Sequence, residues 1–215
     1  MENLNVFFVP SHVIGDSIAD ISSFLNTIKK QKIDNLLWSE SGYKPTVDFA
    51  IAYTENNILL KYFVSEKYFK ADFKQINDPV YQDSCVEFFI AFGGDESYYN
   101  LEFNALGTAL IAYGSGKNDR NYSDVATVAQ IQSKHNITST PNKQGDTEWE
   151  LTLNIPFTLF THHNITSLIG ESCRANFYKC GDDLPVPHFI SWSVIDYPTP
   201  NFHLPQFFGT ILFDK

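Results

Sequence analysis

DSCVEFFIAFGGDESYYNLEFNALG (residues 83–107) holds two apolar, strand-like runs on either side of a glycine-rich turn. Apolar side chains alternate on one face of each run: Val86, Phe88, Ile90 and Phe92 in the first, and Tyr99, Leu101 and Phe103 in the second. Both faces need a core, so the runs predict an antiparallel hairpin that pairs Phe88 with Leu101 and Ile90 with Tyr99. The stretch therefore predicts a sheet that packs one apolar face against the rest of the fold.

The same register gathers polar groups on the second face of the hairpin. It places Glu87 opposite Glu102, with Cβ atoms ~5 Å apart. The polar face is then made of Glu87, Asn100, Glu102 and Asn104, with Asp83 at its edge. Two carboxylates directly opposite each other destabilise a sheet unless something relieves them. An arginine, a metal, a shared proton or open water could do so.

Two arginines are candidates for this relief. Arg120 follows a glycine-rich segment, and Arg174 alternates with Asn176 along another strand-like run, where both could share the polar face. The simpler alternative is an exposed sheet face with solvated charges. Asn, Glu and Arg with few lysines is an unusual composition for such a face.

The remaining sequence extends the β pattern along the chain. Strands are expected at 4–9, 47–65 (a hairpin with its turn at 55–57), 108–114, 125–133, 149–157, 173–180 and 207–214. A helix is expected within 15–30, with Asp16 or Ser17 as its N-cap, and loops at 115–124 and 181–206. We predict one domain over residues 1–215, mainly β, an antiparallel β-sandwich of jelly-roll or immunoglobulin-like type with a strand and a short helix as an N-terminal extension over 1–37. An α+β domain with a mostly antiparallel sheet is the alternative.

Composition narrows the classes of partner. The net charge of -10 disfavours nucleic acids and anionic membranes, and no apolar run is long enough to insert into a membrane. The first residues lack the basic segment of a secretory signal, so we expect a cytoplasmic protein as written, or a periplasmic or secreted one if a signal was trimmed. Cys173 and Cys180 would lie ~23 Å apart on one strand, which favours reduced cysteines. We expect a monomer.

Several motifs, taken in order, carry a resemblance to a known family. They are WSESGYKP (38–45), QDSCVEFFIAF (82–92), YYNLEFNALGT (98–108), GSGKNDR (114–120), WELTLNIPF (149–157), RANFYKCGD (174–182), PHFISWSV (187–194) and NFHLPQFFGTILF (201–213). Together they resemble carbohydrate-binding module family 9, in the stand-alone form of bacterial carbohydrate degraders. The resemblance runs from about Trp38 to Phe213 and leaves the N-terminal helix outside.

The resemblance implies a β-sandwich that binds oligo- or polysaccharides without cleaving them, in the service of polysaccharide breakdown. Family members hold a sugar between two aromatic rings, bind its hydroxyls with polar side chains and carry structural calcium. The matching positions imply a carbohydrate site made of Glu87, Asn100, Glu102, Asn104, Arg120, Arg174, Asn176, Trp192, Phe202 and His203. Sugar rings present apolar C–H faces and many hydroxyls, which suits aromatic, Glu, Asn and Arg side chains.

The sequence also departs from the family pattern. The characterised clamp uses two tryptophans, whereas the C-terminal loop here offers Trp192, Tyr197, Phe202 and His203, with no identifiable second clamp ring. For calcium, the resemblance and the loop positions suggest Asp83, Asp95 and Asp119 as ligands, although no regular calcium-loop spacing is present. The histidines lack the spacing of a zinc site.

Two other functions stay open. A retaining glycoside hydrolase of endoglucanase or xylanase type needs two carboxyl groups ~5–5.5 Å apart, a separation that Glu87 and Glu102 could meet. An accessory protein-interaction domain would instead show an exposed apolar patch and no acidic cluster beside an arginine.

Overall fold

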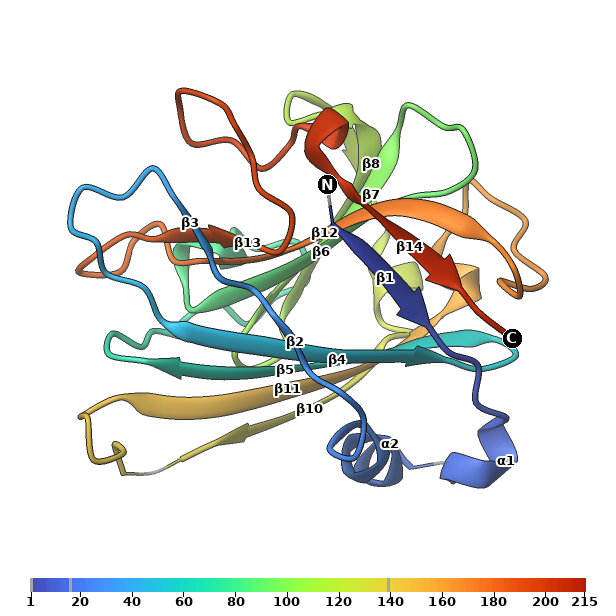
Figure 1. Cartoon of the computed structure of the whole chain (residues 1–215), viewed down its shortest axis with the longest axis horizontal. Coiled ribbons are helices and arrows are strands. Elements are labelled where there is room, and N and C mark those ends of the chain that lie inside the picture. The colour runs from blue at the N-terminus through green and yellow to red at the C-terminus, as the bar shows by residue number, and fades with distance from the viewer. Residues whose placement is uncertain (1, 16, 139) are drawn as a thin grey trace.

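A computed structural model describes residues 2–15, 17–138 and 140–215 and shows two stacked β-sheets (Figure 1). The larger sheet has the strand order β1-β14-β12-β6-β7-β8-β9, and β13 joins β12 to β3 beside it. Its strands are β1 (Asn3–Val6), β3 (Asn35–Leu37), β6 (Cys85–Ala91), β7 (Tyr98–Asn104), β8 (Ala109–Gly116), β9 (Asp119–Tyr122), β12 (Ser172–Cys180), β13 (Phe189–Ser191) and β14 (Gly209–Phe213). The smaller sheet has the order β10-β11-β5-β4-β2. Its strands are β2 (Gln31–Lys32), β4 (Thr46–Tyr53), β5 (Asn57–Glu66), β10 (Gln132–Ile137) and β11 (Thr147–Pro156).

The fold is therefore the predicted mainly β sandwich. In the described part of the chain, neighbouring strands pair antiparallel, except that β1 runs parallel to β14. Short helices lie outside the sheets: α1 (Ser11–Ile14), α2 (Ile18–Leu25), α3 (Val125–Val128) and the 3-10 turns η1 (Val80–Gln82), η2 (Phe157–Leu159) and η3 (Pro205–Phe207). None of the helices in the described part of the chain is long and apolar enough to cross a membrane.

The central hairpin adopts the register that its alternation predicts. Phe88 pairs with Leu101, Ile90 with Tyr99, and Glu87 with Glu102. The apolar face of this hairpin packs against the smaller sheet. At this contact the Phe177 ring of β12 stacks on Phe88 of β6, with 4.9 Å between centroids, and on Phe49 of β4 in the smaller sheet, with 3.9 Å. Each such ring adds about 1.5–3 kcal/mol when fully buried, so the interlayer contact fixes which face of β6 and β7 points inward.

The opposite face of the hairpin is also covered, which the alternation does not reveal. Every residue of β6 and β7 is buried. A second apolar cluster lies on this outer face and is supplied by loops that fold back over the sheet, including Val80, Phe202 and Phe208. The alternative of an exposed face with solvated charges is therefore wrong, since Glu87 and Glu102 are only 3% and 2% exposed.

Helix α2 covers the outer face of the smaller sheet (Figure 1). The Ser17 side chain caps it by accepting a hydrogen bond from the Asp20 N–H, as predicted, while Asp16, the alternative N-cap, lies outside the described residues. Ile21 and Leu25 pack on Ala50, Ala52 and Leu59 in a third apolar cluster.

Several segments differ from the expectation, among them residues 181–206, expected as a loop, which contain strand β13. Residues 115–124, expected as a loop, contain edge strand β9, which pairs with β8 and carries Arg120. Residues 125–133, expected as a strand, begin with α3, because Asp124 caps a helical turn by accepting from the Thr127 N–H; strand β10 starts only at Gln132. Local capping thus overrides the apolar alternation of this segment.

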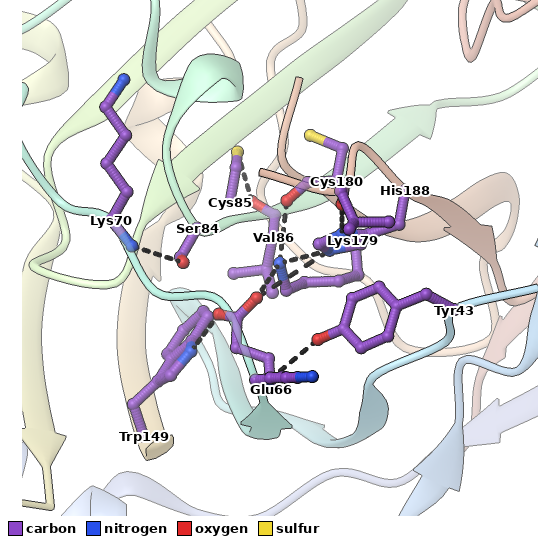
Figure 2. A network of polar contacts seen from close by, with 12 residues as sticks. Tyr43, Glu66, Lys70, Ser84, Cys85, Val86, Trp149, Lys179, Cys180 and His188 are labelled. Atoms are coloured by element: carbon purple, nitrogen blue, oxygen red, sulfur yellow. Dashed lines mark hydrogen bonds and ion pairs between the residues drawn. The ribbon is translucent and has the colours of Figure 1, made fainter. Parts of the chain in front are cut away.

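A buried polar network joins the two sheets beside β12 (Figure 2). Lys179 Nζ lies 2.9 Å from Glu66 Oε2 and 2.9 Å from His188 Nε2, and it donates to the Cys180 carbonyl. Trp149 Nε1 donates to Glu66 Oε1 at 2.6 Å. All four side chains are at most 1% exposed. The network fixes β12 against β5, and in Figure 2 the sulfur atoms of Cys85 and Cys180 point away from it.

His188 makes folding of this network sensitive to acid. Lys179 donates to its Nε2, so the ring must be neutral, with Nδ1–H donating to the Val186 carbonyl at 3.2 Å. Burial, and then the charge of Lys179, lower the pKa of His188 from 6.5 to about 3. The unfolded chain therefore takes up the proton first. The stability that neutral His188 contributes is complete above the unfolded pKa of about 6.5 and is lost as the pH falls toward 3.

We expect His188→Gln to reduce the acid sensitivity of the protein. Between pH 7 and pH 4, wild type should lose about 3 kcal/mol more unfolding free energy than the variant, at ~1.4 kcal/mol per unit of pKa difference. Urea unfolding of both proteins at the two pH values measures this difference. Parallel pH dependence of the two proteins would contradict the buried neutral ring.

Candidate functional site

A pocket of about 310 Å³ opens on the outer face of the larger sheet. Its floor comes from β6, β7 and the end of β12, and its walls from η1, the β8–β9 hairpin, β13 and the C-terminal loop before η3. The lining residues are Tyr81, Glu87, Glu102, Lys117, Arg120, Tyr122, Cys180, Asp182, Phe189, Pro200, Asn201, Phe202 and His203. The pocket thus combines carboxyl groups, two cations and several aromatic rings.

The two paired carboxyl groups on the floor of the pocket accept hydrogen bonds, one from an arginine and the other from a thiol. Glu102 Oε1 accepts from Arg120 Nη1 at 3.1 Å and from Asn100 Nδ2 at 2.9 Å. Glu87 Oε1 accepts from the Cys180 thiol at 3.0 Å. Arg120 therefore relieves part of the repulsion between the two facing glutamates.

Raised pKa values of both glutamates relieve the rest of the repulsion. Burial, and then the charge of Glu102, raise the pKa of Glu87 well above its usual range. Burial raises the pKa of Glu102 to about 7, although the Arg120 guanidinium opposes the shift. Both shifts favour a proton on the pair, because two ionised carboxylates would otherwise be buried side by side. Such a pair offers both a donor and acceptors to a bound molecule.

Arg120 is held in place from two sides. Its Nη1 donates to Glu102 and lies 3.3 Å from His203 Nε2, while His203 Nδ1 lies 2.8 Å from the Tyr98 hydroxyl. Burial, and then Arg120, lower the pKa of His203 to about 3, so the ring is neutral and accepts from the arginine. Within the described residues the hydrogen bonds of this guanidinium run through Nη1 alone. Its other N–H donors are left for a ligand.

An unused acceptor lies beside this arginine. Glu102 Oε2 is buried and has no hydrogen-bond partner among the described residues. A buried oxygen without a partner costs about 1–3 kcal/mol. A ligand hydroxyl or a cation in the pocket would recover that energy.

Aromatic rings form one wall of the pocket. Phe202 stacks on Tyr178, with centroids 4.2 Å apart and planes at 10°, and meets Phe189 edge-on at 6.0 Å. Trp38 packs behind Phe202 and donates its Nε1–H to the Tyr197 carbonyl, which ties down the C-terminal loop. Tyr122, on β9, is 58% exposed at the rim.

Comparisons with known proteins show the family and the fold of this chain. The model of carbohydrate-binding family 9 matches residues 19–213. The chain belongs to carbohydrate-binding family 9. The family match starts inside α2, so it is longer at the N-terminus than the motifs from Trp38 onward suggested. The comparison with curated proteins gives no match.

Solved structures resemble this family-9 protein over nearly its whole length. A crystal structure of a proposed carbohydrate-binding protein from Bacteroides uniformis has a TM-score of 0.90 at 38% identity, covering 99% of both chains. Two structures of a family-9 carbohydrate-binding module from Caldicellulosiruptor kristjanssonii follow. The glucose complex has a TM-score of 0.62 at 13% identity, covering 99% of this chain and 95% of that one. The cellotriose complex has 0.61 at 14%, covering 99% and 94%. At these identities the module's structures show a shared fold.

The structure brings half of the sequence-predicted sugar residues of this family-9 protein together. Glu87, Glu102, Arg120, Phe202 and His203 line the pocket. Asn100 lies directly behind them as a donor to Glu102. The other four predicted residues do not line this pocket.

Asn104 and Arg174 hold backbone segments instead. Asn104 Nδ2 donates to the Phe73 carbonyl and to Asp83 Oδ2. Arg174 donates to the carbonyls of Asp95 and Pro205 and so links two loops.

Asn176 and Trp192 belong to the packing around β13. The Asn176 side chain bonds both the N–H and the carbonyl of Ser193. Trp192 lies edge-on to Phe49 (6.4 Å) and Phe177 (5.6 Å) in the core and is 6% exposed. It is a core residue, because the pairing of β13 with β12 turns the ring inward.

The three carboxylates suggested for calcium have separate partners. Asp83 is fully buried and accepts from the N–H groups of Asp72 and Phe73, while Asp119 accepts from the Ser115 hydroxyl. Asp95 accepts from the Tyr113 hydroxyl and the Ser97 N–H. Their oxygens form no common cluster in the described part of the chain, so these residues do not fit one calcium site.

Sequence reasoning missed several lining residues. Lys117 and Tyr122 flank Arg120 in the β8–β9 hairpin, so recognising β9 as a strand would have indicated them. Cys180 is the last residue of β12, and Asp182 lies two residues further on. No local sequence spacing connects either residue to Glu87. Only the pairing of β12 with β6 does so.

Proposed function

We propose that this family-9 protein binds a carbohydrate in the pocket on the outer face of the larger sheet, without cleaving it. The main observation behind this proposal is the Arg120–Glu102 pair beside an aromatic wall. Among the described residues, the pair has guanidinium donors without a hydrogen-bond partner and an unpartnered acceptor, Glu102 Oε2. Hydroxyl groups of a sugar can use both donors and acceptors of this kind, and the apolar face of its ring can lie on an aromatic side chain.

The size of the pocket favours a short ligand. A volume of about 310 Å³ lies at the small end of small-molecule sites. We infer that the site accepts one or two sugar units, such as the end of a chain, and that Phe202 and Tyr122 are the stacking rings. A role in polysaccharide breakdown follows as part of the same proposal, since recognition of chain ends serves the enzymes that release them.

A melting-temperature screen tests the proposal. Glucose, cellotriose and a panel of other mono- and oligosaccharides are added at a large excess, each with calcium and with a chelator. A ligand at ~100 times its dissociation constant should add about 2.7 kcal/mol to the free energy of unfolding. Titration calorimetry then measures the affinity of each hit. A panel in which no sugar shifts the melting temperature would contradict carbohydrate binding; the chelator arm tests the calcium prediction.

Hydrolysis is the second candidate, favoured by two glutamates that face each other on β6 and β7 and whose pKa values are both raised. A retaining enzyme needs one acid and one ionised nucleophile. Release of new reducing ends from the oligosaccharides in the melting-temperature screen would favour hydrolysis over binding alone.

A further inference from the structure

Two buried thiols and a carboxyl group lie together at the floor of the pocket, where Glu87 and Cys180 line it and Cys85 lies beside them. Cys85 and Cys180 lie directly opposite each other on the paired strands β6 and β12. One ligand atom from each of Cys85, Glu87 and Cys180 lies within 4.8 Å of the other two. We propose that these three side chains bind a thiophilic divalent cation of the Zn²⁺ class. This inference goes beyond carbohydrate binding and does not depend on it.

The three ligands sit on rigid elements rather than on loops. Cys85 and Glu87 are two residues apart on β6, so their side chains leave the same face of the sheet. Cys180 comes from the neighbouring strand, which the buried Lys179–Glu66 pair fixes from the opposite face. All three are at most 3% exposed, and strand positions of this kind hold ligand geometry more closely than loops do.

The donor set suits zinc better than calcium. Thiolates select soft or borderline metals, whereas calcium requires six or more oxygens. Zinc–sulfur bonds of ~2.3 Å and zinc–oxygen bonds of ~2.0 Å bring tetrahedral ligand atoms to roughly 3.5 Å from one another. The Cys180 sulfur lies 3.0 Å from Glu87 Oε1, and the Cys85 ligand atom lies within 4.8 Å of both, so small side-chain movements would bring the three atoms to these spacings.

A fourth position is open toward the pocket. Glu87 and Cys180 both line it, so a water molecule or a ligand oxygen could complete the coordination from that side. Three protein ligands with one exchangeable position is the arrangement of open zinc sites.

The pocket also holds more carboxyl groups than lysine and arginine side chains. Glu87, Glu102 and Asp182 line the same pocket, against Arg120 and Lys117. Lys179, next to Cys180 in the sequence, turns to Glu66 on the other face and does not neutralise this cluster. The unpartnered Glu102 Oε2 lies on the adjacent strand and is an independent indication of a missing positive or donor group.

Cobalt titration of the reduced full-length protein tests the site directly. Co²⁺ in a thiolate site gives a near-ultraviolet charge-transfer band and visible absorption of tetrahedral type, and Zn²⁺ should displace it. Native mass spectrometry should show one metal per wild-type chain. We expect Cys85→Ser and Cys180→Ser each to weaken binding by more than about 100-fold, beyond the usual effect of removing a partner that only supports a metal ligand.

Cys173→Ser is the matched control. Cys173 is also buried and also lies on β12, but it packs in the core between the sheets. This variant should keep the wild-type cobalt spectrum and zinc affinity. Melting temperatures without metal show whether each variant is folded.

Three results would overturn the proposal. Wild-type protein that takes up no metal would do so without any variant. Metal binding that survives both Cys85→Ser and Cys180→Ser, or is lost equally in Cys173→Ser, would place the metal elsewhere. A Cys85–Cys180 disulfide that resists reduction in the native protein would show that the two sulfurs serve a covalent link instead.

Discussion

Lys179→Met is expected to lower the free energy of unfolding by about 3–5 kcal/mol. The variant keeps the length of the side chain but removes the ammonium group that lies 2.9 Å from Glu66. Both side chains are fully buried, so Glu66 would keep an uncompensated charge away from water. Urea unfolding followed by tryptophan fluorescence measures the loss, and Trp149 in the network is a local reporter.

Lys61→Met provides the matched control for this prediction. Lys61 is also buried and lies 2.8 Å from a carboxylate, but that partner, Glu150, is 38% exposed and can be hydrated once the lysine is gone. We expect a loss nearer 1 kcal/mol. The double variant Lys179→Met/Glu66→Gln should recover much of the stability. Equal losses for the two lysine variants would show that burial of the partner carboxylate does not govern the effect.

Arg120→Ala should reduce sugar affinity by roughly 10- to 100-fold, the equivalent of about one hydrogen bond to a charged group. The change removes the guanidinium donors that have no protein partner and frees Glu102 from its ion pair. Titration calorimetry with the sugar found in the melting screen measures the loss. The melting temperature of the free variant separates lost binding from lost folding.

Arg174→Lys is the informative comparison, since sequence reasoning implicated both arginines. Arg174 bonds backbone carbonyls of Asp95 and Pro205 and does not line the pocket. Its lysine variant should bind sugar within a few-fold of wild type, whereas Arg120→Lys should lose part of the affinity, because lysine lacks the planar fork of donors. A larger loss at position 174 would refute this division of roles.

The inward face of the hairpin could be predicted because two apolar faces had to meet the same core. The structure adopts the expected register, which pairs Phe88 with Leu101 and Glu87 with Glu102, although a shift by two residues would keep the same faces inward. An arginine was one of four groups that the sequence allowed as relief for these carboxylates, beside a metal, a shared proton and open water. Choosing Arg120 required the β8–β9 hairpin, whose edge strand has no apolar alternation to reveal it.

Contacts between distant segments decided the rest of the site. Trp192 follows a proline-containing stretch that suggested a ligand platform, yet pairing of β13 with both β12 and β3 places it in the core. The Cys85–Cys180 pair arises only when β6 and β12 become neighbours. Periodicity describes one strand at a time, so neither result could be read from the local sequence.

The parallel pairing of β1 with β14 has a consequence for how the molecule is made. β14 is the last of the described strands, and both β1 and β12 pair with it. On the ribosome, the first strand must therefore wait without its neighbour until residues 209–213 have been synthesised. The loop that carries Phe202 and His203 comes just before β14, so the ligand pocket can be completed only after residues 209–213 have been synthesised and have paired.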